Sequence, residues 1–297
     1  KFIYLDDSEI AVINKNGIKI YSFTGEEKEK MPQRADADLN SDGRDGYEHF
    51  MLKEIYEQPE AVRKTIDSYY KNGEINFGFG SEFIEKLKNT DKIYFTACGS
   101  AYHAGRTAEL FFEKILKIPC RAVIASEMRY SFTPLGKKTL VIAISQSGET
   151  ADTLASLKKA KESGAVTLSV VNVKDSYIAK TGESVIYTRA GREIAVATTK
   201  GYTTQLTALY MLGIYLAKIR DSAADKELDE YENELFSLAD KIKNTVSLSG
   251  YISRRAPFTA FEKDVFFIGR GVDFTCVLEG SLKLKEITYI HSECLPA

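Results

Sequence analysis

From Lys92 onward, short apolar runs rich in valine and isoleucine alternate with longer segments that have helical spacing. The apolar runs read KIYFTA, CRAVIAS, TLVIAIS, AVTLSVVNV and SVIYTRAG, and two of the helical segments read GRTAELFFEKIL and TTQLTALYMLGIYLAKI. Near-continuous apolar strands separated by helices are typical of a parallel sheet that is covered on both faces. The pattern therefore predicts an α/β fold built on a doubly wound parallel sheet.

Residues 1–46 follow a different pattern. The segment EIAVINKNGIKIYSF alternates apolar and polar residues on both sides of Asn16-Gly17, which is a strong hairpin signal. A two-stranded ribbon is too small to be a domain by itself. The polar, turn-rich segment after it is typical of a linker. We therefore expect residues 1–46 to be the last hairpin of a preceding domain plus a linker, in a chain that is part of a longer one.

Two further units are expected, residues 47–222 and residues 223–297. The first begins with YEHFMLKEIYEQPEAVRKTIDSYY, where Pro59 interrupts the helical spacing and predicts a break between two helices. The second begins with a charged helix, after which DVFFIGRGVDF repeats the strand, turn and helix of KIYFTACGSAY, so that Gly99 and Gly271 hold equivalent places. This repetition predicts an incomplete second copy of the same domain.

Composition narrows the class of function. Among 297 residues, no apolar run approaches the roughly 20 residues that a membrane span needs. A net charge of −2 without a basic stripe argues against a nucleic-acid partner. Four scattered cysteines and three scattered histidines predict neither a disulfide framework nor a metal site, and suit a reducing cytoplasm. We expect a cytoplasmic protein that uses no metal or other cofactor.

The segment LVIAISQSGETADTL ends an apolar strand with a cluster of small polar residues. Ser145, Gln146, Ser147 and Thr150 lie where the strand meets a helix, and Gly148 keeps the backbone approachable. Open α/β sheets bind ligands at the carboxyl ends of their strands, where helix amides favour anions. A single serine or threonine there would most simply cap the helix. The whole cluster instead predicts a phosphate site made of hydroxyls and amides.

The ligand is expected to be a small phosphorylated metabolite. Neither GxxxxGK[ST] nor GxGxxG occurs, so a nucleoside triphosphate or a dinucleotide is not indicated. The segment TACGSA forms a second strand-to-helix junction, which can offer Ser100 to the same ligand, while Cys98 is interpreted as a buried thiol.

Three ionisable residues fall on one face of the predicted helix LEGSLKLKEITYIHSE. Glu279, Lys283 and Glu286 are spaced at i, i+4 and i+7. A carboxylate beside an ammonium in a cleft can move a proton between adjacent carbons of a sugar. Periodicity alone favours an ordinary solvated helix face with i,i+4 pairs, and further evidence is needed to assign these residues to a site.

Four segments together resemble the glutamine–fructose-6-phosphate aminotransferase family. They are KEIYEQP, SQSGETADTL, EIAVATTKGYTTQ and EGSLKLKEITYIHSE, and the resemblance covers nearly the whole chain. SQSGET by itself identifies only the sugar isomerase (SIS) class of domains, whereas KEIYEQP with KLKEITYIH is specific to the aminotransferases. The resemblance implies a flavodoxin-like SIS domain, followed by a second SIS copy and preceded by a glutaminase domain that survives here only as its last hairpin.

The resemblance also implies roles for residues. Ser145, Gln146, Ser147 and Thr150 would bind the sugar phosphate, with Ser100 at the sugar and the backbone of Val196 at its hydroxyls. Glu286 would be the base that moves a proton between C1 and C2, with Lys283 beside it. The implied partners are fructose 6-phosphate, glucosamine 6-phosphate, the glutaminase domain of the same full-length chain and a second copy in a homodimer.

The sequence also departs from the family pattern. Ala101 stands where the family has a hydroxyl, so sugar affinity or preference is expected to differ, and Ala195 and Thr198 are milder changes. The family's ring-opening histidine and imine-forming lysine have no counterpart among these residues, so we expect binding without full turnover. His291 is interpreted as structural. Two alternatives stay open, a sugar-phosphate deaminase or isomerase of the same class and a sensor that binds amino-sugar phosphates without turnover.

Overall fold

A computed structural model describes residues 3–32 and 43–297, and the chain divides into two compact units, Lys1–Gly46 and Tyr47–Ala297. In the first unit, β1 (Glu9–Asn14) and β2 (Gly17–Ser22) pair antiparallel, and the short β3 (Glu27–Lys28) pairs with β2. The predicted hairpin is confirmed, with Gly17 in a positive-φ conformation at its turn. Residues 33–42 of the predicted linker lie outside the described residues.

The second unit contains a sheet of five parallel strands. They are β6 (Lys92–Ala97), β7 (Cys120–Ile124), β8 (Thr139–Ser145), β9 (Val166–Val171) and β10 (Ser184–Tyr187), in the order β10-β9-β8-β6-β7. This is the flavodoxin-like order, and the predicted doubly wound sheet is confirmed. The chain runs outward in opposite directions from β6 and β8. The carboxyl ends of these two strands therefore flank the switch point at which such sheets bind ligands.

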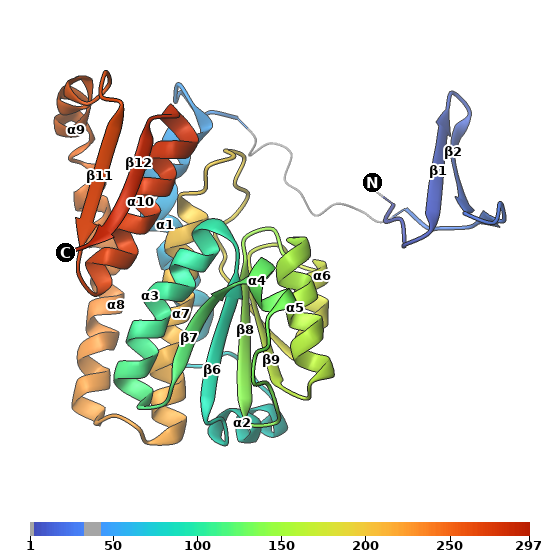
Figure 1. Ribbon diagram of the computed structural model, residues 1–297, viewed down its shortest axis with the longest axis horizontal. Coiled ribbons are helices and arrows are strands. Elements are labelled where there is room, and N and C mark those ends of the chain that lie inside the picture. The colour runs from blue at the N-terminus through green and yellow to red at the C-terminus, as the bar shows by residue number, and fades with distance from the viewer. Residues whose placement is uncertain (1–2, 33–42) are drawn as a thin grey trace. The chain divides into compact units, whose positions relative to one another are not determined.

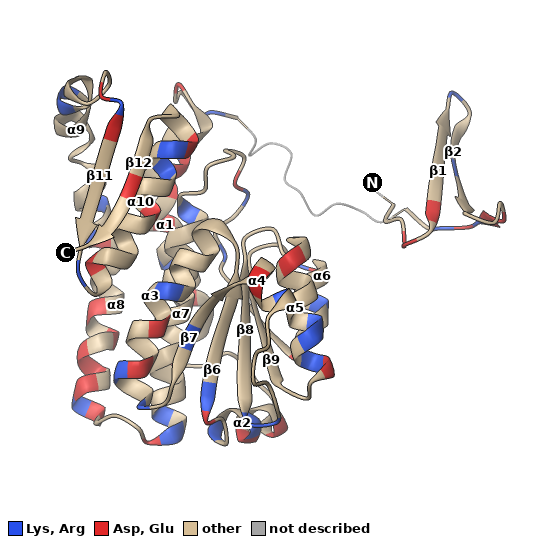
Figure 2. Cartoon of the chain, in the orientation of Figure 1, with Lys and Arg blue, Asp and Glu red and all other residues tan. Residues whose placement is uncertain are grey.

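Helices cover both faces of the sheet (Figure 1). One face packs against α1 (Phe50–Tyr69), α3 (Gly99–Leu116) and α7 (Lys200–Arg220), with α8 (Asp225–Val246) outside them; the other packs against α4 (Ala125–Tyr130), α5 (Ala151–Glu162) and α6 (Tyr177–Thr181). Along β8, Leu140 and Ile142 face the first set of helices, while Val141 and Ala143 face the second. Because both faces are buried, β8 and β9 carry no charged residue (Figure 2).

The predicted break at Pro59 is wrong. α1 runs without interruption from Phe50 to Tyr69 with Pro59 inside it. Proline removes the N–H that would bond the carbonyl four residues earlier, which is that of Ile55. The side-chain amide of Gln58 donates to this carbonyl at 3.0 Å and replaces the missing donor. Close packing of α1 against α7 and α8 also favours the continuous helix.

Short elements complete the first part of this unit, and the C-terminal part contains a second strand–helix–strand motif. The short elements are β4 (Tyr70–Lys71), β5 (Glu74–Ile75) and α2 (Ser81–Lys88). After α9 (Ser249–Arg255) and the 3-10 turn η2 (Ala256–Phe258), β11 (Asp264–Gly269) and β12 (His291–Pro296) pair in parallel, joined by α10 (Val272–Thr288). Gly99, the first residue of α3, and Gly271, the N-cap of α10, both have positive φ.

The helix predicted to reach Glu293 ends earlier, so that part of the prediction is wrong. α10 stops at Thr288, and Tyr289 adopts a left-handed conformation. His291 and Glu293 belong to β12, which pairs with β11 along its whole length. Sheet hydrogen bonds made with a strand 27 residues away cannot be seen in the local helical spacing. Among the described residues, no helix has the length and apolarity that a bilayer crossing requires.

Candidate active site

A cavity of about 190 Å³ lies at the carboxyl ends of β6 and β8. Every residue predicted to form the site lines it, and the full set of lining residues is Cys98, Ser100, Ala101, Ile144, Ser145, Gln146, Ser147, Thr150, Val196, Thr198, Gln205, Lys283 and Glu286. The volume is below the roughly 300 Å³ at which pockets for drug-sized ligands begin, so it suits a small metabolite. Thr198 and Gln205 were not predicted, although both belong to the segment EIAVATTKGYTTQ.

The turn at residues 145–150 is organised by its own hydroxyls. Ser145 Oγ lies 3.0 Å from Thr150 Oγ1 and accepts a hydrogen bond of 3.0 Å from the N–H of Gly148. Ser147 Oγ accepts from the N–H of Glu149 at 3.2 Å. Thr150 is the N-cap residue of α5, but its side chain makes no capping hydrogen bond. The capping interpretation is therefore wrong for Thr150, and the first amides of α5 keep their capacity to bind an anion.

Gly148 is required by close packing as well as by its backbone conformation. Its φ is +71°, and a Cβ atom at this position would lie 2.0 Å from Ser176 Oγ. The carbonyl of Gly148 also accepts a hydrogen bond of 2.9 Å from the N–H of Ile178 in α6. The turn is thus held against the segment that follows β9, which fixes the direction in which its hydroxyls point.

The three ionisable residues of α10 form a connected row. Lys283 Nζ lies 3.4 Å from Glu279 Oε1 and also forms an ion pair with Glu286. The side chains of Glu279 and Lys283 are only 8% and 17% exposed, so the solvated-face interpretation is wrong for them. Glu286 is 39% exposed and lines the cavity together with Lys283. A carboxylate and an ammonium therefore face the same small space as the hydroxyls of residues 145–150.

Glu279 is held as a carboxylate behind the cavity. Burial raises its pKa, but hydrogen bonds from His103 and Ser100 and the charge of Lys283 outweigh burial, so the net pKa is lowered. His103 Nδ1 lies 2.8 Å from Glu279 Oε2. An ionised carboxylate only accepts hydrogen bonds, so the His103 Nδ1–H is the donor. Sequence reasoning missed this pairing because the two residues are 176 positions apart.

The loop that carries Val196 is anchored by two glutamates. Glu193 caps α7, because its carboxylate accepts from the N–H groups of Thr199 at 2.8 Å and Gly201 at 3.1 Å. Glu54 Oε1 accepts from the N–H groups of Ile194 at 2.5 Å and Ala195 at 3.2 Å. The side chain of Val196 is fully exposed, which leaves its backbone to face a ligand.

The KEIYEQP segment of α1 supplies one of these two glutamates, Glu54, and a further contact. Besides Glu54, Glu57 forms an ion pair of 2.7 Å with Lys200 at the start of α7. Gln58, in the same segment, donates to the Ile55 carbonyl that Pro59 leaves without a backbone donor. The segment was recognised only as a family signature, and its contacts show that it positions the loop at residues 193–199.

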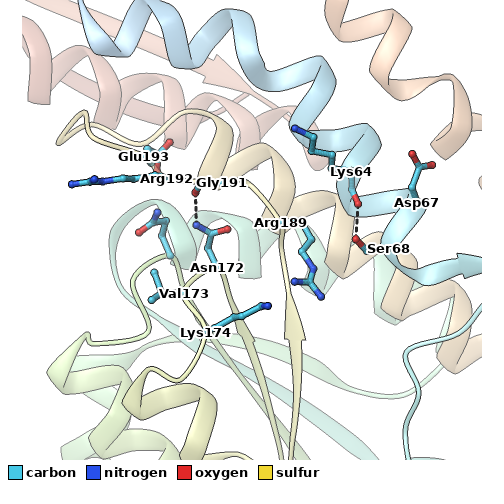
Figure 3. A pocket seen from close by; sticks show the side chains of 11 residues that line it. Lys64, Asp67, Ser68, Asn172, Val173, Lys174, Arg189, Gly191, Arg192 and Glu193 are labelled. Atoms are coloured by element: carbon cyan, nitrogen blue, oxygen red, sulfur yellow. Dashed lines mark hydrogen bonds between the residues drawn. The ribbon is translucent and has the colours of Figure 1, made fainter. Parts of the chain in front are cut away.

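A larger cavity of about 790 Å³ is lined in part by the residues that begin this loop (Figure 3). It is lined by Lys64, Asp67, Ser68, Gln146, Asn172, Val173, Lys174, Arg189, Gly191, Arg192 and Glu193. Asn172 is occupied in the loop structure, since its amide donates to the carbonyl of Gly191 at 2.7 Å. Gln146 is the only residue that this cavity shares with the predicted site. The predicted hydroxyls and the Lys283–Glu286 pair line the smaller cavity.

The described residues contain no cluster of three or more histidine, cysteine, aspartate or glutamate side chains arranged to hold a metal ion. All four cysteines are free thiols. Cys98 lines the small cavity and is half-buried.

Comparison with known proteins identifies the family. Residues 86–215 match the SIS domain model. The chain is 44% identical over 291 residues to glutamine–fructose-6-phosphate aminotransferase, isomerizing, of Clostridium acetobutylicum, and 39% identical over 299 residues to that of Francisella tularensis. These two matches include 98% and 100% of this chain but only 48% and 49% of the relatives. The chain therefore spans about half the length of these relatives.

Solved structures also resemble this chain. The C-terminal domain of glucosamine-fructose-6-phosphate aminotransferase from Francisella tularensis superposes with a TM-score of 0.83 at 41% identity, over 86% of this chain and 72% of that one. Tagatose-6-phosphate ketose/aldose isomerase from Escherichia coli shares only the fold, with a TM-score of 0.63 at 16% identity over 84% of this chain and 67% of that one. The chain therefore belongs to the glutamine–fructose-6-phosphate aminotransferase family, in which it matches the C-terminal domain.

Proposed function

We propose that this chain is the isomerase part of a glucosamine-6-phosphate synthase, which binds fructose 6-phosphate and takes part in its conversion, with ammonia derived from glutamine, to glucosamine 6-phosphate. One observation carries the proposal: an uncharged hydroxyl cradle and a carboxylate–ammonium pair line the same cavity of about 190 Å³. The names of the relatives agree with this activity.

The phosphate is proposed to bind the turn at residues 145–150. Ser145, Ser147 and Thr150 supply hydroxyls, Gln146 supplies an amide, and the first N–H groups of α5 point toward the same end of the sheet. Together with the helix dipole, these donors can balance a dianion without a fixed positive charge. The dianionic end of the sugar would then lie at the β8 side of the cavity.

The proton transfer is assigned to Glu286. Ammonia condenses with the C2 carbonyl of the open-chain ketose and releases water. Glu286 then removes a proton from C1 of the imine while the imine nitrogen gains one, which gives an enolamine. Return of a proton to C2, with loss of the O1 hydroxyl proton, gives the amino aldose. Lys283 is paired with Glu286 and can stabilise its carboxylate form. Ser100 and the backbone of Val196 are proposed to contact the sugar hydroxyls.

The wider context belongs to the same proposal. We infer that residues 1–46 end a glutaminase domain, that residues 47–222 form one SIS domain, and that residues 223–297 begin a second. The parallel β11–α10–β12 motif, with a positive φ at Gly271 as at Gly99, supports the second copy. A homodimer in the reducing cytoplasm is proposed as well, and the four free thiols agree with that compartment.

Calorimetric titration tests the assignment. The chain is expected to bind fructose 6-phosphate and to bind unphosphorylated fructose much more weakly. Ser147→Ala should weaken binding of the phosphorylated sugar, whereas Glu286→Gln should retain binding and, in the whole gene product, abolish turnover. Equal affinity for the two sugars would contradict the proposal. Turnover that survives Glu286→Gln would favour a non-catalytic site, and net release of ammonia from glucosamine 6-phosphate would favour a deaminase.

A further inference from the structure

α3 and α10 are joined by two buried polar contacts one helical turn apart. His103 Nδ1 lies 2.8 Å from Glu279 Oε2, and Thr107 Oγ1 donates to Thr275 Oγ1 at 2.8 Å. The helices pack against each other along this seam. Both contacts hold the seam together, but only the first one continues toward the cavity.

From His103 a row of contacts leads to Glu286, the proposed base. Glu279 uses one carboxylate oxygen for His103 and the other, at 3.4 Å, for Lys283, which pairs with Glu286. Only Lys283 and Glu286 line the site cavity. His103 therefore lies at the far end of a four-residue row whose near end is the proposed base.

Loss of the His103 side chain should disturb the row because Glu279, to which it bonds, is buried. The side chain of Glu279 is 8% exposed and that of His103 is 14% exposed. Without the His103 donor, one oxygen of a buried carboxylate would lose its hydrogen bond, which is costly. Glu279 would then compete more strongly for the ammonium of Lys283, at the expense of Glu286.

Other ionisable groups lie near His103. Lys285, His291 and Glu293 share with it a neighbouring cavity of about 540 Å³. His291 Nδ1 is engaged with Asp264 Oδ1 at 2.7 Å. On its own helix, the ring of Tyr102 lies with its centroid 5.9 Å from that of His103. The hydrogen bond to Glu279 is the contact that links His103 to the site.

We propose that His103 is a positioning residue for the isomerisation, which acts through Glu279 to hold the ammonium of Lys283 between Glu279 and Glu286. The proposal rests on the proposed function, in which Glu286 moves the proton. It assigns to His103 an effect on proton transfer and none on the phosphate cradle.

Two amide variants of the whole gene product test this role. His103→Asn places an amide nitrogen near the position of the Nδ1 donor, whereas His103→Gln carries the same amide one bond farther out. Proton transfer is measured as kcat and as deuterium incorporation from heavy water into the sugar phosphate. We expect His103→Asn to retain activity, and His103→Gln and His103→Ala to lose roughly tenfold or more in kcat with KM unchanged, since small misplacements of catalytic groups cost up to about a hundredfold.

Thr107→Val is the matched control, because it removes the other buried contact of the same seam. It should lower thermal stability and leave kcat and deuterium incorporation unchanged. Wild-type kcat in both His103→Gln and His103→Ala, or an equal loss of kcat in Thr107→Val, would overturn the positioning role while Glu286→Gln remains inactive. If Glu286→Gln keeps wild-type proton transfer, the proposed function itself fails, and this inference fails with it.

Discussion

Glu54, in the second turn of α1, accepts a hydrogen bond of 2.5 Å from the backbone N–H of Ile194, which follows it by 140 residues. The same oxygen accepts from the N–H of Ala195 at 3.2 Å. Glu54 is 2% exposed, so the loop beside the cavity is tied to the core by a buried carboxylate. Loops near active sites usually need such support when they must present backbone groups in a fixed position.

Glu54→Ala should therefore weaken both the fold and ligand binding. Two backbone N–H groups would lose their acceptor, and we expect a loss of about 1–3 kcal/mol in the free energy of unfolding. Affinity for fructose 6-phosphate should fall as well, because Val196 lies in the freed loop. Urea denaturation and calorimetric titration measure the two effects.

Glu54→Gln and Glu60→Gln separate this anchor from general effects of charge. The first keeps a carbonyl acceptor for the two N–H groups and should lose less stability and affinity than Glu54→Ala. Glu60 pairs with Lys64 at 3.6 Å on the exposed face of the same helix, and its change should be nearly neutral. If Glu54→Ala bound the sugar phosphate as tightly as wild type, the loop would not need this anchor.

Gly148→Ala should disrupt the phosphate turn. The new Cβ would lie 2.0 Å from Ser176 Oγ, in addition to the strain of a φ of +71°. Gly164→Ala is the matched control, since its φ is +76° but the nearest atom to its new Cβ, Cγ of Lys137, lies at 4.0 Å. We expect Gly164→Ala to cost about 1–2 kcal/mol in the free energy of unfolding. Gly148→Ala should cost more and abolish binding of the sugar phosphate, and equal effects in thermal melts would contradict the steric argument.

The sequence predicted the strands of the sheet and the polar cluster that follows β8 because both depend on local signals, whereas Val196, Lys283 and Glu286 were assigned through the family resemblance. The apolar run of β8 and the polar cluster after it are contiguous, and parallel strands bring their carboxyl ends to one edge. The supporting residues could not be predicted in the same way. The Glu54–Ile194 contact joins a helix to a distant loop and the His103–Glu279 contact joins two helices, and no spacing in the sequence encodes either of them.

The two wrong helix predictions have the same origin. At Pro59, the local rule for proline was overridden by a neighbouring side chain, that of Gln58, and by packing on α7 and α8. At Thr288, the helical spacing was overridden by pairing between β11 and β12. In each case contacts that the rule applied to the sequence did not include decided whether the helix continued.

The pH dependence of stability tests the state of Glu279. Its pKa lies below the ordinary value of 4.5, so it contributes stability above that pH, and the contribution is lost as pH falls through the folded-state pKa. Glu279→Gln removes this titration. The difference in free energy of unfolding between wild type and Glu279→Gln should therefore be largest near neutral pH and shrink below pH 4.5. A difference that stays constant through this range would show that Glu279 does not titrate with a lowered pKa.

Ala101 lines the site cavity, and the family resemblance predicts a hydroxyl at this position, so a substitution here can add an interaction instead of removing one. Ala101→Ser should donate or accept one more hydrogen bond to the bound sugar. Such a bond contributes about 1 kcal/mol, which corresponds to roughly fivefold tighter binding. Ala104→Ser is the control, because Ala104 is buried on the same helix and does not line the cavity. Calorimetric titration with fructose 6-phosphate and with inorganic phosphate locates the gain: a gain for the sugar phosphate alone places residue 101 at the sugar, whereas an equal gain for both ligands would place it at the phosphate.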